Sequence, residues 1–143
     1  MRTITGILYH SSRADKSGHP YIGHPGRVAQ RVAEVGGPAE AIAAAWLHDV
    51  VEDTWVSLPC LAEAGFPTAV VTAVDAVSKR TGETSEEYAQ RIVPDALAVL
   101  VKRADLADNA SPARLGELDP ETRARLAAKY ADFTTILNTA LTS

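Results

Sequence analysis

The chain has 143 residues, a formal net charge of −4 and a pI near 5.5. This acidic balance argues against duplex nucleic acid or an anionic membrane as the partner. The single cysteine, Cys60, excludes a disulfide within the chain and a cysteine-based zinc site, and it fits a reducing cytoplasm. No apolar stretch approaches the roughly 20 residues of a membrane span, and the first residues lack the apolar segment of a signal peptide. We therefore expect one soluble, cytoplasmic domain over residues 1–143.

Short glycine and proline signals divide the sequence into a series of predicted helices. Helices are expected at about residues 2–14, 24–35, 39–53, 57–64, 67–78, 84–92, 95–109 and 120–141. Pro25 suits a first helical turn, Gly36-Gly37-Pro38 ends the helix that begins there, and Asp119-Pro120 is a start signal for the last helix. Residues 69–77 also allow a strand, but helical spacing serves as well. Because no segment shows sustained period-two alternation, the prediction is an all-α fold.

The predicted helix over residues 39–53 carries four polar side chains that are costly to bury. They are His48, Asp49, Glu52 and Asp53. At about 100° per residue, the four fall within an arc of roughly 140° on one helix face. Glu52 and Asp53 alone could be a solvated helix end, but carboxylates near a helix C-terminus oppose the macrodipole. We therefore expect this face to line a cleft while the opposite face packs.

A second polar pair lies within or next to an apolar segment. Residues 97–106 are apolar nearly all round, which predicts a buried helix that contains Asp105. Asn109 lies one turn further on the same face. In isolation, a buried aspartate beside an amide is more often a satisfied core network. Together with His48-Asp49, the favoured interpretation is a divalent metal site, because a cation offsets the cost of burying unpaired charge.

Four segments of the chain occur in a recognisable order: KSGHPYIGHP at residues 16–25, LHDVVEDT at 47–54, VSK at 77–79 and VKRADLADN at 101–109. Together they resemble the HD-domain metal-dependent phosphohydrolases, and among these the hydrolase domain of Rel/Spo enzymes. The resemblance covers about residues 5–140 and implies a single helical bundle of roughly seven to nine helices. Because the sequence holds only the hydrolase part, we expect a small stand-alone alarmone hydrolase.

By that resemblance, the protein removes pyrophosphate from the 3′ position of guanosine tetra- and pentaphosphate, using one manganese ion. The implied metal ligands are His24, His48, Asp49 and Asp105. Glu52 and Asp53 would form a catalytic acidic pair that orients water and handles protons. Nothing in the residues around His24 singles it out, so its role comes from the resemblance alone.

The resemblance and the placement of cations also suggest which residues contact the nucleotide. The candidates are Asn109, Lys102, Arg13, Lys16 and Tyr130. One departure from the family concerns base recognition, because a pair of arginines usually precedes the Lys-Ser-Gly loop and one of them stacks on guanine. Here these positions are Ala14-Asp15, with Arg13 the nearest arginine. We therefore expect weaker guanine selectivity, with an adenine analogue also accepted.

Two alternatives stay open at this point. The chain could be another HD phosphohydrolase, such as a 5′-nucleotidase, although Glu52-Asp53 argues against that reaction. It could also be an antitoxin that neutralises a cognate small alarmone synthetase, by destroying its product or by binding it. The identity of the released phosphate product separates the first alternative from the favoured function.

Overall fold

The computed structural model describes residues 23–53 and 56–143, with only the backbone of Glu52 and Asp53. All regular secondary structure in these ranges is helical, which confirms the predicted all-α fold. Within the same ranges, none of the helices combines the length and apolarity that crossing a bilayer requires. The helix predicted over residues 2–14 lies outside the described part of the chain.

The helices follow one another with short connections. They are α2 (Gly23–Glu34), α3 (Ala39–Leu47), α4 (Val50–Asp53), α5 (Leu58–Glu63), α6 (Thr68–Val77), α7 (Ser85–Ile92), α8 (Ala96–Asn109), α9 (Pro112–Leu115) and α10 (Pro120–Leu141). Six of these were predicted to within one residue at each end. The short helix α9 was not predicted, although Ser111 caps it and Pro112 occupies its first turn.

The prediction of one continuous helix over residues 39–53 was wrong. The chain leaves helical hydrogen bonding at His48 and Asp49 and resumes it in α4. The His48 Nδ1 atom lies 2.5 Å from the carbonyl oxygen of Ala45. In a continuous helix that carbonyl would accept from the amide of Asp49, four residues on. The His48 side chain therefore competes for the acceptor that would have continued the helix.

Local signals define most of the other helix ends. Thr84 forms a reciprocal capping box with Glu87 at the start of α7, and the Asp95 and Asp119 side chains cap α8 and α10. After α2, Gly37 lies so close to that helix that an added Cβ would sit 2.5 Å from Cγ1 of Val32. A glycine is therefore required where the chain turns from α2 into α3.

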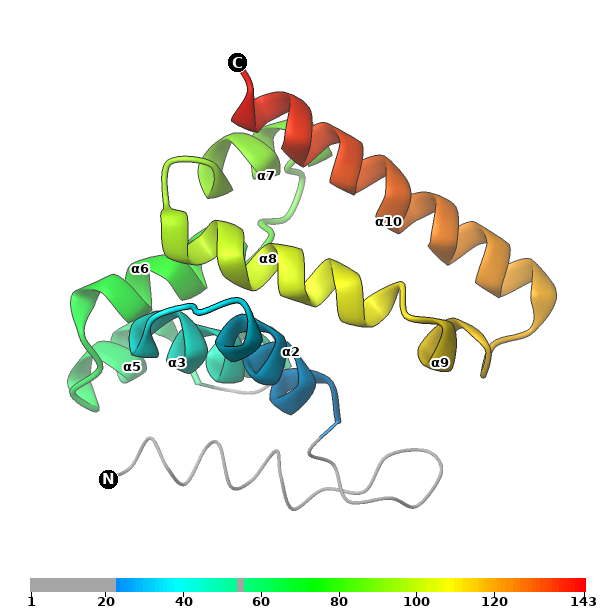
Figure 1. Ribbon diagram of the computed structural model, residues 1–143. Helices are drawn as coiled ribbons and strands as arrows, with labels where there is room; N and C mark the ends of the chain where they lie inside the picture. The colour runs from blue at the N-terminus through cyan, green and yellow to red at the C-terminus, as the bar shows by residue number, and fades with distance from the viewer. Residues whose placement is uncertain (1–22, 54–55) are drawn as a thin grey trace.

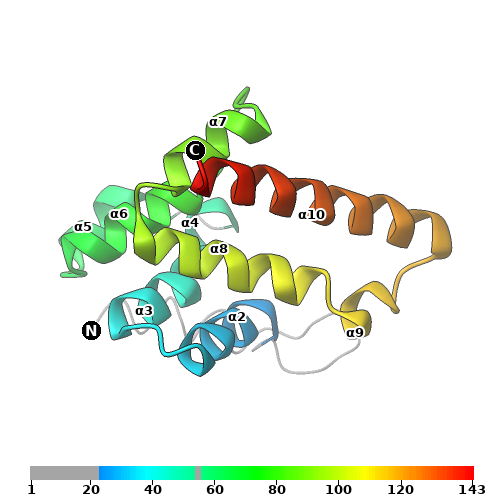
Figure 2. The same ribbon diagram turned by 45° about the horizontal axis from the view of Figure 1, so that its top comes forward.

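Helix α8 is the centre of the bundle. It lies between α10 on one side and α2 with α3 on the other, and it also contacts α6 (Figures 1 and 2). Many of the buried contacts are made by small residues, among them Ala41, Ala44, Ala45, Ala73, Ala98 and Val101. Small side chains allow helix backbones to approach closely. This close packing buries the polar residues of α8 directly against α2, which carries His24, and against α3, which His48 follows.

Candidate metal centre

Three segments that are distant in the sequence place His24, His48 and Asp105 together. His24 lies in the first turn of α2, His48 follows α3, and Asp105 lies on α8. The Nε2 atom of His24 is 2.7 Å from Oδ1 of Asp105, and Nε2 of His48 is 3.3 Å from the same oxygen. One donor atom from each residue lies within 4.8 Å of the others, and all three residues are buried. The described residues thus contain a compact group of two imidazoles and one carboxylate.

Asp49 lies beside this group. Its Oδ1 is 3.2 Å from Nε2 of His48, and its Oδ2 is 3.8 Å from Nε2 of His24. Its side chain is 20% exposed, more than those of the other three residues. The helix break at residues 48 and 49 lets neighbouring side chains face the same point. The predicted association of these four residues is therefore present, with Asp49 nearest to solvent.

The electrostatics of the group favour a cation. Burial alone would lower the pKa of His24, but its hydrogen bonds to Asp105 and Asp108 outweigh burial and raise that pKa to about 9. The pKa of His48 is also raised against burial, chiefly by Asp105. Conversely, burial would raise the pKa of Asp105, but the two histidines hold it far below its usual range. Two nitrogen donors beside carboxylates therefore suit a divalent transition metal, which would take the place of the bound protons.

Both imidazoles are oriented through their Nδ1 atoms. His24 Nδ1 is 2.8 Å from Oδ2 of Asp108, and His48 Nδ1 contacts the Ala45 carbonyl. In metal sites the ring nitrogen opposite the ligand atom usually donates to a carboxylate or carbonyl, which fixes the ring and its tautomer. Asp108, which is 1% exposed, was not among the predicted site residues. Its position three residues after Asp105, on the same face of a buried helix, was the available signal.

Lys102 and Asn109, two of the predicted substrate contacts, lie beside Asp105. Lys102 Nζ is 3.0 Å from Oδ2 of Asp105, and Asn109 Nδ2 donates to Oδ1 at 3.3 Å. The Lys102 ammonium also lies 5.2 Å from the ring centres of both Tyr88 and Phe133. Burial would lower the pKa of Lys102, but Asp105 outweighs it, so the pKa is raised and the side chain carries a positive charge. A fixed cation therefore adjoins the candidate metal centre.

The positions of the remaining predicted residues do not test their predicted roles. Tyr130 lies on α10, where it is partly buried against the hydrophobic core. Arg13 and Lys16 lie outside the described residues, as do the side chains of Glu52 and Asp53. Their assigned roles therefore stay predictions.

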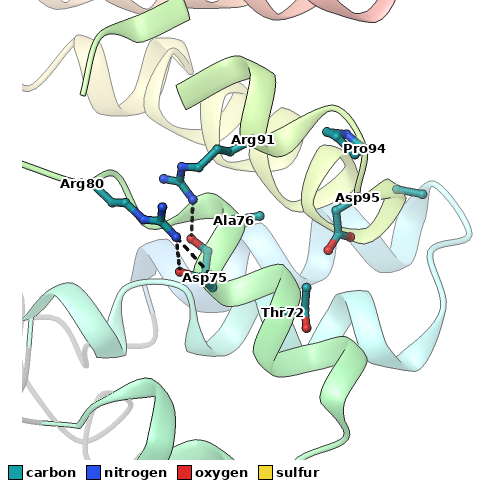
Figure 3. Close-up of a pocket in the computed structure, with 8 residues that line it drawn as sticks. Thr72, Asp75, Ala76, Arg80, Arg91, Pro94 and Asp95 are labelled. Carbon is teal, nitrogen blue, oxygen red and sulfur yellow. Dashed lines mark hydrogen bonds and ion pairs between the residues drawn. The ribbon is translucent and has the colours of Figure 1, made fainter. Parts of the chain in front are cut away.

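A cavity of about 470 Å³ lies elsewhere in the molecule, between α6, α7 and the start of α8 (Figure 3). Its charged lining is largely paired. Arg91 donates to the backbone carbonyl of Asp75, and Arg80 contacts the carboxylate of the same residue. Its lining includes none of the histidines or Asp105. The candidate metal centre is thus separate from this cavity.

Comparison with known proteins identifies the family. A sequence profile described as an HD domain matches residues 7–99, more than half of the chain. A probable guanosine-3′,5′-bis(diphosphate) 3′-pyrophosphohydrolase of Synechocystis sp. is 35% identical over 134 residues, covering 86% of this chain and 17% of the relative. The guanosine-3′,5′-bis(diphosphate) 3′-pyrophosphohydrolase of Haemophilus influenzae is 38% identical over 129 residues, covering 82% of this chain and 19% of the relative. The chain therefore spans less than a fifth of the length of these curated relatives.

A solved structure has the same fold. It is described as a metazoan ortholog of SpoT that hydrolyzes ppGpp and plays a role in starvation responses. It aligns with a TM-score of 0.64 and 23% identity, covering 97% of this chain and 93% of its own. Three findings agree: the profile match, the identity with the two relatives, and the grouping of His24, His48 and Asp105. The chain belongs to the HD-domain family.

Proposed function

We propose that this chain is a manganese-dependent phosphohydrolase that removes pyrophosphate from the 3′ position of guanosine tetra- and pentaphosphate. The observation that carries the proposal is the buried group of His24, His48 and Asp105, with Asp49 beside it. The relatives from Synechocystis and Haemophilus, which are named for this 3′-pyrophosphohydrolase reaction, support the choice of substrate. The description of the metazoan structure as a ppGpp hydrolase supports it as well.

His24, His48, Asp49 and Asp105 would hold one divalent ion. Two imidazoles and two carboxylates leave ligand positions open, which suits manganese better than a closed structural zinc site. When bound, the ion polarises the phosphoryl oxygens and lowers the pKa of water towards neutrality. The Nδ1 contacts of both histidines keep their Nε2 atoms directed at that position.

The other residues of the site act on charge and protons. Water attacks the phosphorus bonded to O3′, and the bond between that phosphorus and O3′ breaks. The water gives up a proton to Glu52 or Asp53, and O3′ takes up a proton as it leaves. The products are a nucleoside 5′-di- or triphosphate with a free 3′-hydroxyl, and pyrophosphate. The Lys102 ammonium offsets negative charge beside Asp105, and Asn109 holds the same carboxylate in place.

The proposal is tested by incubating the purified protein with guanosine tetraphosphate and manganese, then separating the products by ion-exchange chromatography. Guanosine 5′-diphosphate and pyrophosphate are expected in equal amounts, and Asp105→Asn should abolish their formation. Asp132→Asn, on the exposed side of α10, is the matched control and should retain full turnover. In a parallel incubation with a nucleoside 5′-monophosphate, release of orthophosphate without any turnover of guanosine tetraphosphate would indicate a 5′-nucleotidase.

We also propose that base selectivity is relaxed, because Ala14-Asp15 replaces the arginines of related enzymes. An aspartate only accepts hydrogen bonds, and it lacks the guanidinium group with which an arginine stacks on a purine. The adenosine analogue should therefore be hydrolysed at a rate near that of the guanosine compound, and Asp15→Arg should shift the preference towards guanine. Strict guanine preference in the wild type, unchanged by the substitution, would refute this.

A further inference from the structure

Three arginines surround Asp108, the carboxylate that orients His24. Arg27 donates from Nε to Oδ1 of Asp108 at 2.8 Å, and Arg31 Nε lies 3.8 Å from the same oxygen. Arg114 approaches from α9, with Nη1 at 3.3 Å from Oδ2. The three residues are called the arginine cluster below. They come from α2 and α9, which flank the C-terminal half of α8 (Figures 1 and 2).

The arginine cluster carries more positive charge than Asp108 can balance. Three guanidinium groups face one carboxylate in a chain whose net charge is −4. The Asp108 side chain is 1% exposed, whereas the side chains of Arg27, Arg31 and Arg114 are 45%, 41% and 40% exposed. Each arginine therefore contacts Asp108 with only part of its guanidinium group, and the remaining part of that charged group is exposed to solvent.

Within the described part of the chain, each of these guanidinium groups keeps nitrogen atoms that make no hydrogen bond. Among the described residues, Arg27 makes its hydrogen bond to Asp108 through Nε. Its Nη atoms lie over Gly23, where an added Cβ would be 3.1 Å from Nη1. Arg114 makes its contacts through Nη1. Paired guanidinium N–H groups match the geometry of phosphate oxygens.

The arginine cluster adjoins the candidate metal centre. One imidazole ring separates them, since His24 contacts Asp105 through Nε2 and Asp108 through Nδ1. Arg114 Nη1 also donates to Oδ1 of Asn109 at 2.7 Å, and Asn109 in turn contacts Asp105. A nucleotide whose 3′-pyrophosphate lies at the metal centre carries its 5′-phosphates on the same ribose. These phosphates must therefore lie close to the centre, where the described residues offer the arginine cluster.

We propose that Arg27, Arg31 and Arg114 bind the 5′-diphosphate of the substrate nucleotide. The identity of that nucleotide rests on the proposed function, and the arrangement of the arginines does not. Guanidinium groups at this position supply the cations that an acidic protein needs to bind a substrate with four or more phosphates. Arg114 has a second role, because it couples the 5′ subsite to Asn109 and to Asp108, the carboxylate that orients His24.

The test is isothermal titration calorimetry of the manganese-loaded protein with three probes: guanosine 5′-diphosphate, guanosine and inorganic pyrophosphate. Wild type should bind the diphosphate more tightly than guanosine. Arg27→Gln and Arg31→Gln should each weaken diphosphate binding by roughly three- to tenfold, as expected for a charged hydrogen bond reduced by solvent exposure. Arg31→Gln should leave the binding of guanosine and pyrophosphate as before, because Arg31 lies 3.8 Å from Asp108 and is not needed to hold it. Thermal melts check that each variant is folded. Arg80→Gln, an exposed arginine on another face, is the matched control.

Several outcomes would overturn the proposal. If wild type binds guanosine and guanosine 5′-diphosphate with equal affinity, the protein has no subsite for the 5′-diphosphate. Arginine variants that behave like Arg80→Gln would assign the arginine cluster to holding Asp108 only. An equal loss of pyrophosphate binding would place the leaving group there, against the 5′ assignment. Because none of the probes is hydrolysed, the result does not depend on turnover of guanosine tetraphosphate, so failure of the proposed function would be seen separately.

Discussion

Replacing Asp108 with asparagine should separate the orientation of His24 from the direct binding of a metal. The substitution keeps the size of the side chain and removes its charge. Asp108 is not in the group of possible ligands, yet it contacts His24, Arg27 and Arg114 from a fully buried position. Burial would raise the pKa of the Asp108 carboxyl, but His24 and Arg27 lower it to about 2, so the fold stabilises the charged form.

The expected loss of metal affinity follows from this contact. Outer partners of metal-bound histidines typically contribute 10- to 100-fold to affinity, which is about 1.4–2.8 kcal/mol. For the metal-free protein, breaking a fully buried ion pair would cost about 3–5 kcal/mol. The arginines are 40–45% exposed and can rehydrate, so we expect about 1–2 kcal/mol. At this chain length that corresponds to a fall in Tm of about 2–8 °C.

Manganese binding is measured by calorimetry and stability by thermal melts without metal, with Asp132→Asn as the control on an exposed helix face. Asp108→Asn should lower both quantities, and the control neither. If Asp108→Asn binds manganese as tightly as the control, the orientation of His24 does not depend on this carboxylate, which would refute the prediction.

Three further predictions address catalysis, packing and pH. Glu52→Gln and Asp53→Asn should keep the metal but lose at least about tenfold in turnover, and near-normal rates in both would mark a solvated helix end. Leu137→Ala, at a position 1% exposed on α10, should cost about 2–5 kcal/mol in denaturant unfolding, and a smaller loss would mean that the site collapses around the gap. The pKa of Glu83 is lowered from 4.5 to about 2, chiefly by Arg91, so its contribution to stability is present above about pH 4.5 and lost as the pH falls towards 2. Glu83→Gln should flatten that part of the pH–stability curve, and an unchanged slope would refute the assignment.

Much of the fold was predictable because helix signals in this sequence are local. Prolines at first turns, capping residues and a glycine turn gave most helix bounds directly. The break at His48 was not predictable from pattern, since it depends on the His48 side chain competing for the Ala45 carbonyl. Helical periodicity alone predicts a continuous helix across such a position.

The site was predictable to the extent that its residues form motifs. The His48-Asp49 pair and Asp105 were expected to meet, and the described structure brings them together with His24. Asp108 and the arginine cluster were missed for a physical reason. A buried aspartate is recognisable only through its partners, and these come from α2 and α9, which are distant from it in sequence or were not predicted.

Hydrolysis of guanosine tetraphosphate in ¹⁸O-labelled water, with mass analysis of both products, tests the central claim most directly. If water attacks the phosphorus bonded to O3′, one labelled oxygen should appear in the pyrophosphate and none in the guanosine 5′-diphosphate. Asp105→Asn should form neither product. Label in orthophosphate or in the nucleotide, or no turnover by the manganese-loaded wild type, would contradict a 3′-pyrophosphohydrolase built on His24, His48, Asp49 and Asp105.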